Sequence, residues 1–163
     1  DCLLSRGLGD VYKRQVTYNL HVMLRYEIEK QLFNGDLAVD DLPSAWNTMF
    51  KAWFDVDVPE DRLGCLQDIH WSMGAFGYFP TYTLGNLYAA QLLEAMAADL
   101  GDIDELVASG DWEPMLAWLR PRIHERGSQV SPAQLIEDAT GSPPSPEPFL
   151  RYVERKYGEL YQL

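Results

Sequence analysis

The side chains best suited to chemistry in this sequence are concentrated between residues 64 and 71. Within these eight residues they combine hydrogen-bond donors, acceptors and groups that titrate, namely Gln67, Asp68, His70 and Trp71. Three glycines, Gly64, Gly74 and Gly77, lie in and just after this stretch and allow sharp turns or a close approach of the backbone to a ligand. We therefore expect the candidate site here, on a loop that continues to residue 82.

The same loop carries phenol groups, because Tyr78 and Tyr82 follow in the aromatic segment 74–82. The histidine and the two phenols can donate and accept hydrogen bonds. Buried loops, however, also use Gln, Asp and His side chains to satisfy one another. The residue types alone therefore leave two interpretations open, a binding or catalytic loop and a loop that only holds itself together.

Motifs for metal binding or nucleophilic catalysis are weak in the rest of the sequence. His124 and Glu125 begin like a zinc-binding helix, but Ser128 stands where that motif needs its second histidine. His124 is better interpreted as a solvated side chain near a helix C-terminus, where a cation is favoured. His21 lies beside an apolar stripe and is interpreted as a histidine at the edge of a core.

The elements that must position the loop are predicted to be helices. Apolar residues recur every fourth position from Val16 to Leu32, Met23 widens the stripe, and Asn34-Gly35 is a typical helix end. A second helix follows the acidic residues at 40–41 and carries a core-packing row of Trp46, Met49, Phe50, Trp53 and Phe54. Further helices are predicted over 60–66, 81–100, 102–109, 113–123 with a kink at Pro121, 131–141 and 147–161. With no sustained period of two, the fold is predicted to be all-α, a multi-helix array with an irregular active-site loop.

Composition and charge exclude several classes of protein. The 163 residues, 47% of them hydrophobic, suffice for one domain with a sizeable core and argue against disorder. The net charge of −12 repels phosphate and anionic lipid, so we expect no nucleic acid and no membrane as partners. The two cysteines, Cys2 and Cys65, form no disulfide framework, which fits a reducing, cytoplasmic location.

Residues 1–15 differ from the rest of the chain, since they show no helical periodicity and no apolar face. We interpret them as a non-native tail joined at Val16 and exclude them from the predicted fold. A native flexible arm is the alternative.

Three segments resemble the M32 family of metallocarboxypeptidases, the family of carboxypeptidase Taq. Gly64–Trp71 is similar to the GXXQDXHW motif of that family, Val16–His21 to its VTYNLH helix, and Phe76–Ala89 to the run that follows the motif histidine. The resemblance implies that residues 16–163 are the C-terminal part of the M32 catalytic domain, a portion of a larger helical metallopeptidase fold. The IRXXAD motif expected before VTYNLH is replaced by Asp10–Gln15, and the family's HEXXH helix is absent from this sequence.

The resemblance implies a hydrolase that removes C-terminal residues from peptide substrates with a divalent metal, zinc or cobalt. Because HEXXH is missing, it implies that this chain supplies the substrate side of the site, holds no metal itself and is inactive alone. It also implies a full-length parent that forms a homodimer.

The resemblance and an analogy with related zinc peptidases together assign roles on the loop. His70, Tyr78 and Tyr82 are the expected catalytic groups, as donors to the oxyanion of the reaction, with Asp68 orienting His70. Gln67, Asp68 and Trp71 are the expected substrate-binding residues, although packing in the wall of the site is the favoured interpretation for the Trp71 ring. A function of a different class stays open, a non-catalytic helical interaction module whose loop only packs.

Overall fold

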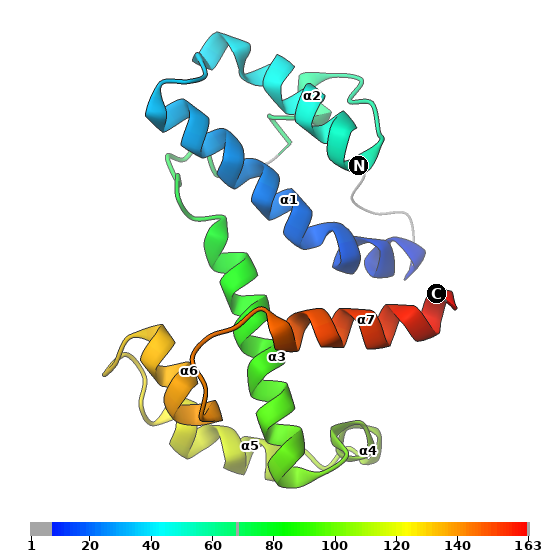
Figure 1. The fold of residues 1–163 in the computed structure, drawn as a ribbon, viewed down its shortest axis with the longest axis vertical. Helices are drawn as coiled ribbons and strands as arrows, with labels where there is room; N and C mark the ends of the chain where they lie inside the picture. The colour runs from blue at the N-terminus through cyan, green and yellow to red at the C-terminus, as the bar shows by residue number, and fades with distance from the viewer. Residues whose placement is uncertain (1–7, 68, 163) are drawn as a thin grey trace. The chain divides into compact units, whose positions relative to one another are not determined.

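The structure, a computed structural model, describes residues 8–67 and 69–162 and divides between Thr83 and Leu84 into two compact units. Within these ranges the chain forms helices, turns and loops and no strand (Figure 1). The predicted all-α class is therefore confirmed. None of the helices in these ranges combines the length and the apolar composition needed to cross a membrane.

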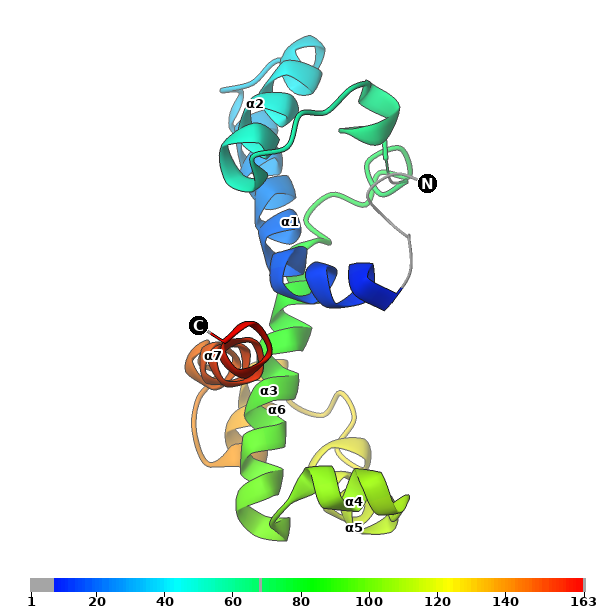
Figure 2. The same ribbon diagram turned by 90° about the vertical axis from the view of Figure 1, so that its right-hand side faces the viewer.

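The first unit is built on α1, Leu8–Asn34, and α2, Leu42–Phe54, which pack side by side (Figures 1 and 2). Gly35, with a φ of +78°, ends α1 in the left-handed conformation that the sequence predicts. A 3₁₀ turn, Val39–Asp41, leads into α2, whose first turn contains a proline. The position of α2 thus agrees with the prediction from its acidic and proline residues.

The start of α1 lies earlier than the sequence predicts, at Leu8 instead of Val16. The prediction relied on an apolar stripe, which residues 8–15 lack. A helix that already has a nucleus gains one backbone hydrogen bond for each residue it adds, and it needs no buried face to do so. Helical periodicity therefore marks the packed part of a helix and does not reveal helical residues that extend beyond it.

The core of the first unit joins α1 and α2 to the segment that follows them. Its buried side chains are Leu24, Ile28, Trp46, Phe50 and Cys65. The predicted stripe on α1 extends too far, because Leu20 and Met23 are exposed. The α1 residues in this cluster or packed against it are Leu24, Ile28 and Leu32, so the packed part of the predicted stripe begins at Leu24.

The segment between α2 and the next helix is less helical than predicted. Only a 3₁₀ turn, Asp61–Leu63, forms where the sequence predicts a helix over 60–66. The buried Gly64 ends it with a φ of −111° and a ψ of −118°, outside helical geometry. A Cβ atom at Gly64 would lie 2.7 Å from Val58 Cγ1 and 3.2 Å from Trp46 Cδ1, so close packing requires glycine there.

The second unit begins within α3, Pro80–Leu100, and contains the four remaining α-helices. They are α4, Ile103–Ser109, α5, Glu113–Leu119, α6, Pro132–Thr140, and α7, Glu147–Tyr161. Asp102 caps α4 by accepting hydrogen bonds from two backbone N–H groups, and Ser131 caps α6 in the same way with one. Except for the end of α5, which lies at Leu119 instead of residue 123, these boundaries lie within one or two residues of the predicted ones.

The kink predicted at Pro121 is a π-helical turn, Arg120–His124, that directly follows α5. Proline has no N–H group to donate to the preceding turn, which favours the wider geometry. The Asp99 carboxylate fixes this region to α3, accepting from Trp118 Nε1 at 2.7 Å and from Arg122 Nη2 at 3.2 Å. Trp118 is also a core residue of the second unit, with Met96 and Ile103.

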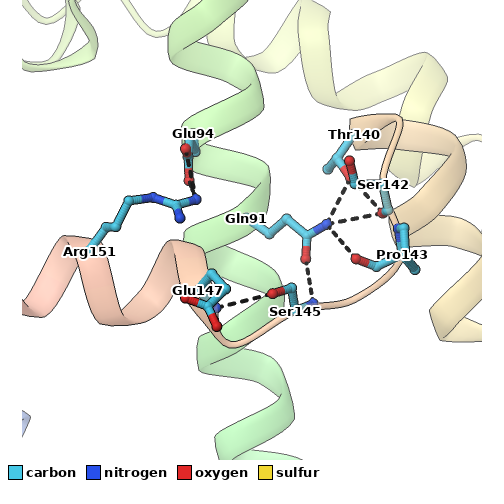
Figure 3. Close-up of polar contacts among 8 residues, drawn as sticks. All are labelled: Gln91, Glu94, Thr140, Ser142, Pro143, Ser145, Glu147 and Arg151. Carbon is cyan, nitrogen blue, oxygen red and sulfur yellow. Dashed lines mark hydrogen bonds and ion pairs between the residues drawn. The ribbon is translucent and has the colours of Figure 1, made fainter.

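A buried glutamine on α3 holds the loop between α6 and α7 (Figure 3). Gln91 Nε2 lies within 3.1 Å of three acceptors, which are Thr140 Oγ1, Ser142 O and Pro143 O. Its Oε1 accepts from the Ser145 N–H at 3.0 Å. This network lines an open groove of about 450 Å³, whose rim carries the ion pair of Glu94 with Arg151.

Candidate functional site

The loop between residues 69 and 79 places its aromatic residues by closing on itself. The Ala75 N–H donates to His70 O at 2.8 Å, and the Gly74 N–H donates to Trp71 O at 3.0 Å. Gly74 and Gly77 have φ values of +74° and +72°, a conformation that other residues rarely adopt. The chain thereby reverses after His70 and returns to it at residue 78.

The three predicted catalytic residues lie together in the structure. His70 Nε2 and Tyr82 Oη are 3.2 Å apart and share a hydrogen bond whose direction depends on the imidazole tautomer. The Tyr78 ring stacks on His70 with centroids 5.9 Å apart, and it meets the Tyr82 ring edge-on at 5.3 Å. Residues separated by up to 12 positions in sequence thus form one cluster, which we call the His–Tyr cluster.

The His–Tyr cluster stands between a buried wall and solvent. Phe79 is buried and its ring lies 4.7 Å from His70, whereas the Tyr78 side chain is 49% exposed. Tyr18 of α1 packs edge-on against Tyr82, and Asn19 Oδ1 accepts from Thr83 Oγ1 at 2.9 Å. The cluster is therefore supported from α1 and retains an open side that a ligand could approach.

The predicted substrate-binding residues Trp71 and Gln67 have different surroundings in the structure. Trp71 is half-buried against the core of the first unit, and its indole N–H donates to Glu29 Oε1 at 2.8 Å. Gln67 is half-buried in the turn after Gly64, where its backbone N–H donates to Gly64 O. Asp68 lies outside the described residues, so its predicted role stays a prediction.

Helix α1 carries two buried charged residues that the sequence did not point to, Arg25 and Glu29. The Arg25 guanidinium lies over two rings, 4.9 Å from the centroid of Trp46 and 5.1 Å from that of Phe79. Glu29 is only 4% exposed and also accepts from the Gly77 N–H at 3.0 Å. Each directly follows a residue of the apolar stripe, and nothing in the sequence distinguishes them from the solvated charges of the same helix.

The remaining reactive groups do not join the cluster. Burial, and secondarily the charge of Asp61, raises the pKa of the Cys65 thiol, which favours an unreactive core residue. His21 stacks on Phe54 with centroids 4.4 Å apart, as a histidine at the edge of the core should. His124 is exposed at the end of the π turn.

Within the ranges that the structure describes, no three His, Cys, Asp or Glu side chains lie together in a way that could hold a metal ion. These side chains therefore do not fit a divalent metal. The His–Tyr cluster can donate and accept hydrogen bonds at an imidazole and two phenols.

A model of the carboxypeptidase Taq (M32) metallopeptidases matches residues 11–157. The chain is similar to thermostable carboxypeptidase 1 of Thermus thermophilus, 48% identical over 147 residues that make up 90% of this chain and 29% of that protein. It is also similar to carboxypeptidase 1 of Bacillus subtilis, 42% identical over 149 residues, with 91% and 30% covered.

Solved structures of carboxypeptidases are also similar to this chain. The M32 carboxypeptidase from Deinococcus radiodurans matches with a TM-score of 0.86 at 39% identity, over 90% of this chain and 30% of that chain. A structure of the Pyrococcus furiosus carboxypeptidase matches with a TM-score of 0.84 at 40% identity, over 87% and 29%. The chain thus spans less than a third of the length of these relatives. The match of the family model over 11–157 shows that this chain belongs to the M32 family of carboxypeptidase Taq metallopeptidases.

Proposed function

We propose that this chain supplies the substrate-binding and transition-state-stabilising wall of a metal-dependent carboxypeptidase that removes C-terminal residues from peptides. The observation that carries the proposal is the hydrogen bond between His70 Nε2 and Tyr82 Oη, with Tyr78 stacked beside it on an open face. These two contacts bring together an imidazole and two phenols from two of the segments by which the chain resembles its family, Gly64–Trp71 and Phe76–Ala89.

The reaction calls for a donor of this kind. When water attacks a peptide carbonyl, negative charge develops on the carbonyl oxygen, and a donor held in place lowers the free energy of that transition state. If His70 donates through Nε2 to the Tyr82 oxygen, the phenol proton is directed away from the ring and can be given to the oxyanion. The exposed Tyr78 phenol is a second donor on the same face.

Gln67 and Asp68 are proposed to hold the peptide, and Trp71 to form the wall beside them. The Trp71 donor is engaged by Glu29, so its contribution to substrate is the face of its ring. Tail residues 1–15 have no part in this proposal.

The metal of the parent enzyme is proposed to be zinc or cobalt, held by a part of the family's length that this chain does not span. The 163-residue chain alone is then expected to bind no stoichiometric zinc and to hydrolyse no peptide. One tightly bound zinc per chain, together with carboxypeptidase activity that a chelator abolishes, would overturn this view. A homodimer and a cytoplasmic location are proposed for the parent on the family resemblance alone.

The test of the His–Tyr cluster uses the full-length parent protein. His70→Ala should lower kcat by ~10²–10³, with a much smaller change in KM, because the donor acts mainly in the transition state. Tyr82→Phe removes only the hydroxyl and keeps the ring contacts, so a loss of kcat there cannot be attributed to packing. Tyr161→Phe, an exposed tyrosine on α7, is the matched control and should leave both constants unchanged.

Melting temperatures measured on the same preparations separate catalysis from folding. A loop that only packs would give His70→Ala a lower Tm with kcat per folded molecule unchanged. That result would favour the non-catalytic interaction module and refute the proposal.

A further inference from the structure

Glu29 is a carboxylate placed where burial is costly, since it lies near the C-terminal end of α1 and is 4% exposed. Both of its oxygens accept hydrogen bonds from the loop that carries the site. Oε1 accepts from the Trp71 indole N–H at 2.8 Å, and Oε2 accepts from the Gly77 backbone N–H at 3.0 Å. One side chain thus binds two points of the loop that lie six residues apart.

These two points adjoin the His–Tyr cluster. Trp71 directly follows His70, and Gly77 directly precedes Tyr78. Between them the loop is closed by the bonds of Ala75 to His70 and of Gly74 to Trp71. The carboxylate therefore holds the loop at one residue beside the imidazole and at one residue beside the Tyr78 ring.

We propose that Glu29 is a positioning residue, which clamps both ends of the 71–77 loop and so fixes His70 against Tyr78 and Tyr82. It touches none of the three rings of the cluster in the contacts described above and acts through Trp71 and Gly77. The catalytic meaning of this inference rests on the proposed function, but the placement of His70 can be measured without it.

The clamp requires a carboxylate of this length. Glu29→Gln has one acceptor oxygen, and its NH₂ group faces one of the two N–H donors instead of accepting from it. Glu29→Asp keeps both acceptors but withdraws them by one methylene, so it should restore part of the placement. Glu27→Gln is the matched control, because Glu27 lies on the same helix and its carboxylate pairs with Lys30 at 2.8 Å near the surface.

The experiment uses NMR on the 163-residue chain. The ¹⁵N shifts of the His70 imidazole report its tautomer and hydrogen bonding, and amide hydrogen exchange reports the protection of the Gly77 N–H. Glu29→Gln should move the His70 shifts and speed Gly77 exchange by about tenfold, the factor expected from losing a hydrogen bond to a charged acceptor. Glu29→Asp should give smaller changes, and Glu27→Gln should give none.

A folded Glu29→Gln variant with wild-type His70 shifts and wild-type Gly77 exchange would overturn the inference. If that variant does not fold, Trp71→Phe removes one donor and leaves the bond to Gly77. It should then move the His70 ¹⁵N shifts while Gly77 stays protected, and unchanged His70 shifts would again overturn the inference.

The outcome is distinguishable from that of the proposed function. Unchanged kcat in His70→Ala refutes the catalytic role of the cluster and leaves the NMR result standing. Unchanged His70 shifts in Glu29→Gln refute the clamp and leave the His70 kinetics standing. If the catalytic role of the His–Tyr cluster and the Glu29 clamp are both supported, Glu29→Gln in the full-length parent should lower kcat about tenfold or more, with KM within about twofold of the wild-type value.

Discussion

Replacing Gln91 by leucine should destabilise the second unit strongly, although the two side chains have nearly the same volume. An amide supplies two N–H donors, and three acceptors lie within 3.1 Å of Gln91 Nε2, so at least one hydrogen is shared. Counting two donors and the acceptor for the Ser145 N–H gives three hydrogen bonds. At about 1 kcal/mol each, the variant should lose about 3 kcal/mol of unfolding free energy.

Urea unfolding followed by the indole NMR signal of Trp118, a core residue of the same unit, measures this loss. With an m-value of about 2 kcal/mol/M, 3 kcal/mol moves the midpoint by about 1.5 M. Gln134→Leu is the control, since Gln134 makes an exposed bond to Asp138 one turn away on α6, worth less than ~0.5 kcal/mol. If Gln91→Leu shifts the midpoint no more than Gln134→Leu does, the network does not hold the loop and the reasoning is wrong.

Two further predictions concern packing and exposure. Gly64→Ala should lower the unfolding free energy by about 1–3 kcal/mol, because its Cβ would lie 2.7 Å from Val58 Cγ1. Gly85→Ala should raise the unfolding free energy by about 0.5–1 kcal/mol, because nothing lies within 4 Å of the added Cβ. Equal urea midpoints for the two variants would contradict this. The apolar side chains exposed on α1 should make the isolated chain bind a hydrophobic dye or self-associate; they are Tyr18, Leu20, Met23, Tyr26 and Phe33. A monomer in sedimentation experiments that binds no dye would show this expectation to be wrong, and Met23→Lys should weaken both effects.

Helix boundaries were predictable from the sequence wherever a local signal exists. Gly35, Asp102 and Ser131 end or begin helices through their own backbone conformation or side-chain oxygen, and such signals are local. The 60–66 segment was mispredicted because the conformation of Gly64 is dictated by Trp46 and Val58, which approach it only in the folded unit. Contacts of that kind leave no trace in a local pattern.

The candidate site was likewise predictable only where the signal is local in sequence. The loop and its His70, Tyr78 and Tyr82 could be proposed from residue types and a motif, and the structure brings these three together. Glu29 could not, because a charged residue on an amphipathic helix is ordinarily solvated and its burial depends on donors 42 and 48 positions away. Partners of a site that lie on another element are visible only after folding.

The π-helical turn after α5 also determines the direction in which the side chains that follow it point. Its Arg120 O accepts from the Glu125 N–H, five residues on, so the turn contains one residue more than an α-helical turn. One residue corresponds to about 100° of rotation around a helix axis. Arg122 within the turn faces Asp99 of α3, and Arg126 beyond it pairs with Asp138 of α6 at 2.6 Å. The direction of the second ion pair therefore depends on the number of residues between 120 and 125, so a gain or loss of one residue in this stretch should turn Arg126 away from Asp138.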